Sequence, residues 1–202
     1  FPVGEASIYY YAPFVWSGGG DLVSEDGLSV DGYFNSSQMA EAMEFFRGVV
    51  EKGYMSEAPI EHLFESGRAA FKIDGAWEVN TVYQNYPDIR LGVAPYVVGE
   101  SWDGGRYTPT GSWAYAASSD SENLKGATEL VKWMSGVESG VRIWELSKTF
   151  PSTYEAFEQI DVFQTDENYR FLYEQLKEYG HPRPKTPVYP QVSTSFQQAL
   201  ES

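Results

Sequence analysis

Aromatic side chains beside glycine turns are the residues of this chain best suited to bind a small ligand. Asp74-Gly75 predicts a turn that follows a short buried strand and delivers Trp77 at the start of a helix. A tryptophan face can cover the apolar C–H face of a sugar ring, because its quadrupole attracts the slightly positive hydrogens. The competing interpretation is a packing tryptophan, which we favour for Trp133 and Trp144 because both lie on predicted apolar helix faces. The aromatic residues predicted to lie at a glycine turn or a strand end are Tyr9, Tyr10, Tyr11, Trp16, Trp77 and Trp113.

Catalytic chemistry has little support in the sequence. The histidines are His62 and His181, there is no cysteine, and neither histidine accompanies a G-x-S-x-G serine. The metal-binding spacings are missing, and the run Gly18-Gly19-Gly20 precedes an acid instead of a phosphate-binding Lys-Ser/Thr pair. We therefore expect a binding protein without a cofactor or a catalytic residue.

Composition further limits the kinds of partner that the chain could bind. The chain has 202 residues and a formal net charge of −15, which argues against nucleic acid because phosphate binding needs clustered Lys and Arg. Its apolar runs are shorter than the roughly 18 residues of a membrane span. The chain starts on an aromatic segment without a start signal and finishes in mid-helix. We expect it to be the carboxy-terminal part of a longer exported protein.

Strand-like and helical segments alternate, which predicts an α/β class. The predicted strands are 7–11, 69–73, 91–94 and 112–117, with a hairpin across 103–105. The predicted helices are 37–52, 60–65, 77–86, 121–134, 138–146 and 168–179, with another from 192 onward. Ser36 or Ser37 is the expected N-cap of the first long helix, and Asp120 or Ser121 that of the helix ending at Met134. The expected buried face of the latter helix contains Leu124, Ala127, Val131 and Met134.

Six segments resemble, in order, those of the sugar-binding proteins of ABC importers, the group that includes maltose-binding protein. Residues 64–77 are similar to the family's "ASGKAAM-x-I-x-GPW" segment, with Ala76 in place of the usual proline. The other segments are 14–22, 35–54, 91–96, 111–135 and 150–152. The resemblance implies the C-terminal lobe of a type II periplasmic-binding-protein-like fold, with helices packed around a small mixed sheet. It implies that 112–152 crosses to an N-terminal lobe missing from residues 1–202.

The same resemblance marks site residues. Trp77, Trp113 and Trp16 match family aromatics, and the first of them commonly stacks on sugar. Gly111 begins the segment similar to the family's "GGw", where Ser112 replaces the second glycine and adds a hydroxyl that could reach a sugar oxygen. Tyr10 completes the expected ligand-binding set.

The implied function is binding of a carbohydrate, an oligosaccharide in view of the aromatic supply. Binding would take place in the periplasm or, for a lipid-anchored protein, on the extracellular face of the membrane. Closure of two lobes would then present the sugar to ABC permease subunits. Two alternatives stay open: a free-standing carbohydrate-binding module, and a glycoside hydrolase fragment that would need a carboxylate pair such as Asp74 and Glu78. Without the missing lobe, we expect residues 112–150 to self-associate or to repack.

Overall fold

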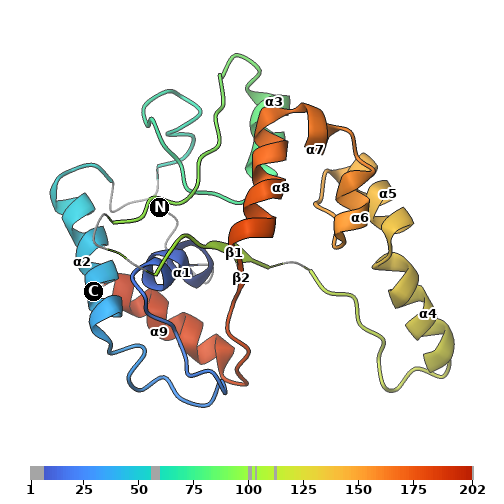
Figure 1. Ribbon diagram of the computed structural model, residues 1–202, viewed down its shortest axis with the longest axis horizontal. Helices are drawn as coiled ribbons and strands as arrows, with labels where there is room; N and C mark the ends of the chain where they lie inside the picture. Colours follow the sequence, from blue (N-terminus) through green and yellow to red (C-terminus); the bar gives the residue numbers. More distant parts are fainter. Residues whose placement is uncertain (1–6, 56–59, 100–101, 103, 112, 202) are drawn as a thin grey trace. The chain divides into compact units, whose positions relative to one another are not determined.

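The computed structural model describes residues 7–55, 60–99, 102, 104–111 and 113–201. The chain divides into two compact units. Unit 1 comprises Phe1–Asp74, Ala94–Gly111 and Gln175–Ser202, and unit 2 comprises Gly75–Val93 and Ser112–Glu174. The elements in chain order are α1 (Ser7–Ser17), α2 (Ser37–Glu51), α3 (Trp77–Asn85), β1 (Thr108–Thr110), α4 (Leu124–Met134), α5 (Val137–Ser147), α6 (Tyr154–Glu158), α7 (Val162–Thr165), α8 (Glu167–Tyr179), β2 (Gly180–Pro182) and α9 (Tyr189–Glu201) (Figure 1). Within the described ranges, no helix is long and apolar enough to cross a bilayer.

The core of unit 1 is built around α1, which contacts α2, α9 and β1 (Figure 1). Nearly every residue of α1 is buried, as is typical of a helix that is hydrophobic all round. The buried residues of this core are Ile8, Tyr11, Ala12, Phe14, Val15, Trp16, Leu22, Val23, Met39, Ala42, Phe46, Val192 and Phe196. The prediction of a strand over 7–11 is therefore wrong. It relied on the β-propensity of tyrosine, and burial on all sides of a helix outweighs that preference.

Helix α2 follows its sequence signals closely. The backbone N–H of Met39 donates to the Ser36 side chain at 3.1 Å, which confirms Ser36 as the N-cap. Gly53, just after the helix, adopts the left-handed φ of 71° that favours glycine. Met39 and Phe46 are buried in the same core cluster as the residues of α1.

The sheet is smaller than predicted. β1 and β2 pair in parallel, with Thr108 opposite Gly180 and Thr110 opposite Pro182. The α/β class, rich in helices with a small sheet, is as predicted, but the sheet in the described residues is parallel and not mixed. The individual strands expected at 69–73, 91–94 and 113–117 do not form, and the hairpin across 103–105 is replaced by pairing with a strand about 70 residues later. A short apolar run becomes a strand only when a partner edge is available.

The segment at 91–93 shows one reason for the missing strands. The Asn168 side chain accepts from the Val93 N–H at 3.0 Å and donates to the Leu91 carbonyl at 3.1 Å. It also donates to the Tyr83 hydroxyl at 2.9 Å. Because one buried amide side chain satisfies this extended backbone, the segment needs no neighbouring strand.

Unit 2 has its own aromatic core between α5 and the first part of α8. Trp144 is buried with its ring centroid 4.7 Å from that of Phe163 and 5.2 Å from that of Tyr169, which confirms Trp144 as a packing residue. Phe157 and Tyr173 stack with their ring centroids 4.8 Å apart. Helix α3 adds the buried side chains Val79 and Val82.

Helix α4 departs from expectation. Its N-cap is Asn123, whose side chain accepts from the Gly126 N–H at 3.0 Å, so the predicted caps Asp120 and Ser121 are wrong. None of the α4 residues is buried, and Trp133 is 57% exposed. The apolar stripe of α4 exists as predicted, but Leu124 is exposed and Ala127, Val131 and Met134 are only partly buried, although α5 contacts this helix. The predictions of a buried face and of a packing role for Trp133 are therefore wrong.

Candidate functional site: two sets of carbohydrate-binding candidates

Trp77 is the first residue of α3 in unit 2, and its side chain is 52% exposed. The backbone of Gly75 lies directly beneath the indole ring, so a Cβ at that position would collide with the ring. Glycine is thus required for the indole to lie against the turn. This geometry matches the predicted glycine turn that delivers a tryptophan, and it leaves about half of the side chain open for stacking.

Trp113 lies in an irregular segment of unit 2 and is 93% exposed. A tryptophan this exposed contributes little to the stability of its own unit, so its apolar surface is available to a ligand or a partner. Ser112, predicted to offer a hydroxyl to the sugar, lies outside the described residues.

Trp16 has a different environment. It is 3% exposed in the core of unit 1, with its ring centroid 4.4 Å from that of His181 and 6.1 Å from that of Tyr107. Its Nε1 donates to Asp21 Oδ1 at 3.2 Å. A ring surrounded in this way offers no face for stacking, so we leave Trp16 out of the site proposed below. The sequence could not distinguish it from Trp77, because both stand beside glycine turns.

Tyr10 lies on α1 and is partly buried. Its ring packs edge-on against that of Tyr9 at a centroid distance of 5.4 Å. Because residues 7–17 form a helix, Tyr9 and Tyr10 do not alternate across a strand. Both belong to the layer of side chains around the core of unit 1.

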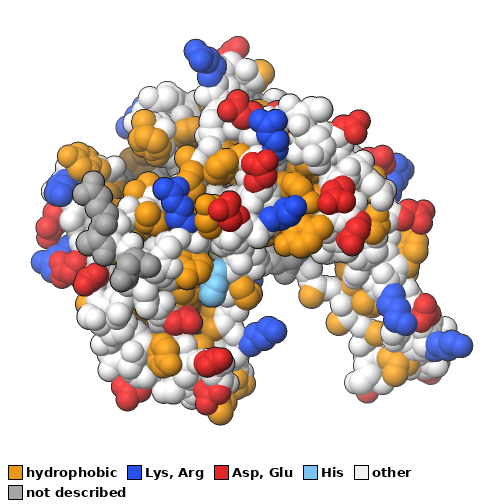
Figure 2. Space-filling model, viewed as in Figure 1, with side chains coloured by type: hydrophobic (Ala, Val, Ile, Leu, Met, Phe, Trp, Pro, Cys, Tyr) orange, Lys and Arg blue, Asp and Glu red, His pale blue; other side chains and the backbone are white. Residues whose placement is uncertain are grey.

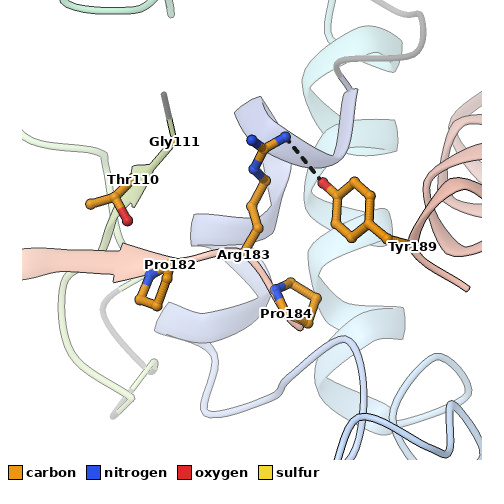
Figure 3. Close-up of a pocket in the computed structure, with 6 residues that line it drawn as sticks. All are labelled: Thr110, Gly111, Pro182, Arg183, Pro184 and Tyr189. Atoms are coloured by element: carbon orange, nitrogen blue, oxygen red, sulfur yellow. Dashed lines mark hydrogen bonds between the residues drawn. The ribbon is translucent and has the colours of Figure 1, made fainter. Parts of the chain in front are cut away.

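A pocket of about 410 Å³ lies in unit 1 at the carboxyl ends of the two parallel strands (Figure 3). Its lining residues are Thr110, Gly111, Pro182, Arg183, Pro184 and Tyr189. Ligands of α/β proteins commonly bind at this end of parallel strands. Gly111, one of the predicted site residues, lies in this pocket. A Cβ there would stand 2.9 Å from Arg183 Nη2, so glycine keeps room for the guanidinium.

The charge in this pocket comes from Arg183. Its guanidinium carbon lies 5.6 Å from the ring centroid of Tyr9 and 5.5 Å from that of Tyr189. Nη1 donates to the Tyr189 hydroxyl at 3.3 Å (Figure 3). Burial raises the pKa of Tyr9, while the nearby Arg183 charge acts in the opposite direction. The sequence did not identify Arg183 as a site residue, because residues 180–187 are proline-rich and are typical of an extended connection. The available signal was a basic residue between two prolines in an acidic chain.

The predicted site residues therefore fall into two sets. Trp77 and Trp113 belong to unit 2, whereas Trp16, Tyr10 and Gly111 belong to unit 1. Figure 2 shows acidic and basic side chains interspersed over the face in view, with hydrophobic side chains between them. Within the described ranges, no three His, Asp or Glu side chains are grouped so that they could hold a metal ion. The chemistry on offer is aromatic stacking together with hydrogen bonding.

The chain belongs to the bacterial extracellular solute-binding protein family, whose sequence model matches residues 4–170. Putative binding proteins of Brucella abortus and Brucella suis are 27% identical to it over 113 residues. That match covers 54% of this chain and 27% of each relative, so it spans about a quarter of their length.

Solved structures show the same fold. An ABC transporter solute-binding protein from Thermotoga lettingae, bound with alpha-D-tagatose, has a TM-score of 0.76 at 21% identity and covers 98% of this chain. The cyclic alpha-maltosyl-1,6-maltose binding protein of Arthrobacter globiformis has a TM-score of 0.74 at 23% identity and covers 99% of this chain. The maltose/maltodextrin-binding domain of Bdellovibrio bacteriovorus, bound to maltotriose, has a TM-score of 0.72 at 21% identity and covers 96%. The chain spans 51–52% of their length. The expected membership of the extracellular solute-binding proteins is thus confirmed, and the chain shares its fold with these solved structures.

Proposed function

We propose that this protein binds a carbohydrate outside the cell and presents it to the permease of an ABC importer. Family membership supports a solute-binding role, and the three solved proteins named above bind sugars. The observation that carries the proposal is Trp77, half-exposed over a glycine turn at the start of α3. An apolar ring in this position suits the C–H face of a sugar. The proposed role is binding without catalysis or a cofactor.

The proposed mechanism is closure of two lobes on the sugar. Trp77 and Trp113 would cover ring faces, and side-chain and backbone donors would meet the hydroxyls. The amino-terminal lobe would supply the other half of the site. The closed form would then dock on the permease, at the extracellular face of the bacterial membrane or in the periplasm.

We further propose that residues 112–152 cross to that amino-terminal lobe. The support is helix α4, which has an apolar stripe but no fully buried residue, in a chain that spans about half the length of solved relatives. If so, residues 1–202 alone should bind sugar much more weakly than the intact protein. Equal affinity of the two would favour a free-standing carbohydrate-binding module.

The test is calorimetric titration of the intact protein with maltose, maltotriose and tagatose, followed by titration of the Trp77→Ala variant with the best ligand. Loss of a stacked ring should weaken binding by about 1–3 kcal/mol, with the melting temperature nearly unchanged. Tyr154→Ala is the control, because it removes an exposed aromatic ring of the same unit outside residues 112–152. A Trp77→Ala variant that keeps its affinity and loses most of its thermal stability would contradict the proposal.

A further inference from the structure

The unit 1 pocket carries the positive charge of Arg183, which forms no ion pair with a described carboxylate. Arg183 is the charged residue among the six that line it. Two other arginines show the contrast: Arg47 lies 3.0 Å from Glu51 and Arg142 lies 2.8 Å from Glu145. In the part of the chain that the structure describes, no Asp or Glu forms an ion pair with Arg183, although the sequence carries 29 acidic residues.

Arg183 is also held in place before any ligand arrives. The rings of Tyr9 and Tyr189 both lie within cation–π distance of its guanidinium. One N–H donates to the Tyr189 hydroxyl, and a guanidinium has five N–H donors. The remaining donors keep a fixed direction, because aromatic contacts and one hydrogen bond already restrict the side chain.

The walls of the pocket give this guanidinium room and polar neighbours. Gly111 brings bare backbone next to Nη2, where a side chain would crowd the arginine. Thr110 adds a hydroxyl from the last residue of β1, and Pro182 and Pro184 add apolar walls (Figure 3). A guanidinium, a hydroxyl and apolar walls together match a sugar ring that bears an acidic substituent.

We propose that this pocket binds the anionic group of an acidic saccharide, with Arg183 donating to its oxygens. The proposal rests on the carbohydrate-binding function proposed above and narrows its ligand class. The planar guanidinium matches a carboxylate or a phosphate with two parallel hydrogen bonds, which a neutral hydroxyl cannot accept equally well. The net charge of −15 opposes an anionic ligand only weakly, since charges beyond about 8 Å are screened at physiological salt.

The test compares charged and neutral saccharides on the intact protein by calorimetric titration. The probes are trigalacturonate, its uncharged counterpart galactotriose, and galactose 6-phosphate, which separates a carboxylate from a phosphate source. We expect an acidic probe to bind at least about 10-fold more tightly than galactotriose, because charge-assisted hydrogen bonds are stronger than neutral ones. Arg183→Gln should remove that preference by lowering the affinity for the acidic probe far more than the affinity for galactotriose. The control is Arg106→Gln, an exposed arginine of the same unit outside the pocket lining.

The following outcomes distinguish failure of this inference from failure of the proposed function. Equal or tighter binding of galactotriose, unaffected by Arg183→Gln, overturns the acidic ligand and leaves the carbohydrate function standing. Binding of none of these saccharides, nor of maltose, maltotriose or tagatose, overturns both. If Arg183→Gln does not fold, Gly111→Ala replaces it: the added methyl group meets Nη2 and should lower the affinity for the acidic probe more than the affinity for galactotriose. An unchanged acidic preference in a folded Gly111→Ala variant contradicts the inference.

Discussion

The most apolar helices of the two units differ in how deeply they are buried. In unit 1, α1 is buried along nearly its whole length, between α2, α9 and β1. In unit 2, α4 has a well-formed apolar stripe and no buried residue. Both helices are rich in apolar residues, yet one forms the centre of a core and the other has no fully buried residue and leaves Leu124, Leu130 and Trp133 exposed. An apolar pattern therefore predicts which face of a helix seeks contact, but not whether that contact lies within the same chain segment.

The same contrast separates the tryptophans. Trp16 and Trp144 are core residues of units 1 and 2, whereas Trp77, Trp113 and Trp133 are exposed. If the exposed rings serve binding or docking and the buried rings serve stability, substitutions should divide along that line. The following experiments test this division, beginning with the largest expected effect.

Trp16→Ala should destabilise the protein by about 3–5 kcal/mol, because it leaves a cavity in the unit 1 core and removes the hydrogen bond to Asp21. Chemical denaturation of the variant measures this loss. Trp16→Phe, which keeps an aromatic ring, is the control and should cost clearly less. If Trp16→Ala folds with near-normal stability and loses sugar affinity, then Trp16 is a ligand contact after all and the division is wrong.

Alkaline pH should weaken unit 1 through its buried tyrosines. Burial raises the pKa of Tyr11 and of Tyr96 above the ordinary value, so the folded state holds their protons more tightly than the unfolded chain does. Stability should be constant below about pH 10 and fall above it, by up to about 1.4 kcal/mol per pH unit for each tyrosine.

Urea unfolding between pH 8 and pH 11 measures this slope. Tyr96→Phe should reduce it, because a phenylalanine has no proton to release. Tyr54→Phe, at an exposed position, is the control and should leave the slope unchanged. An identical slope in the Tyr96→Phe variant and the wild type would show that Tyr96 does not cause the loss of stability at alkaline pH.

Removing the helix caps of α2 and α4 should have smaller effects on stability and compares the two helices directly. Ser36→Ala removes the cap of a helix that packs on α1 and should cost about 1 kcal/mol of global stability. Asn123→Ala removes the equivalent cap of α4 and should cost less, because α4 adds little packing to the cooperative unit. Thermal denaturation of both variants measures the difference. A larger loss for Asn123→Ala would mean that α4 is stabilised by contacts that the present structure does not show.

The smallest effect on stability is expected on the open face of α4. The double variant Leu130→Gln, Trp133→Ser should change the unfolding free energy of residues 1–202 by no more than about 0.5 kcal/mol. It should also reduce any self-association, which light scattering measures. Lys132→Gln, at an exposed position on the same helix, is the control. A wild-type monomer whose residues 113–150 are cut readily by protease would rule out both self-association and repacking.

Local signals predicted most of the long helices and few of the strands, although residues 61–65 of the helix expected at 60–65 form turns only and α1 was predicted as a strand. Ser36 as the N-cap and Gly53 as the stop define α2 because both act within one turn of the helix. The strand predicted at 69–73 failed because Phe71 found no partner edge and lies exposed. β1 instead pairs with β2, far along the chain, and their short, polar residues give no apolar alternation that would reveal a strand.

The sequence by itself determined what lies within a few residues: the capped helices, the glycine turn beneath Trp77, and the order of segments that marks a solute-binding protein. Tertiary structure alone decided which aromatic residues are buried and where Arg183 lies. Trp16 and Trp77 have similar neighbours in the sequence, yet one joins the core and the other stays half-exposed. Arg183, Tyr9 and Gly111 come from three distant segments, and only the packing of α1 beside the paired strands brings them together. Burial and pockets depend on contacts between distant segments, which short-range patterns do not encode.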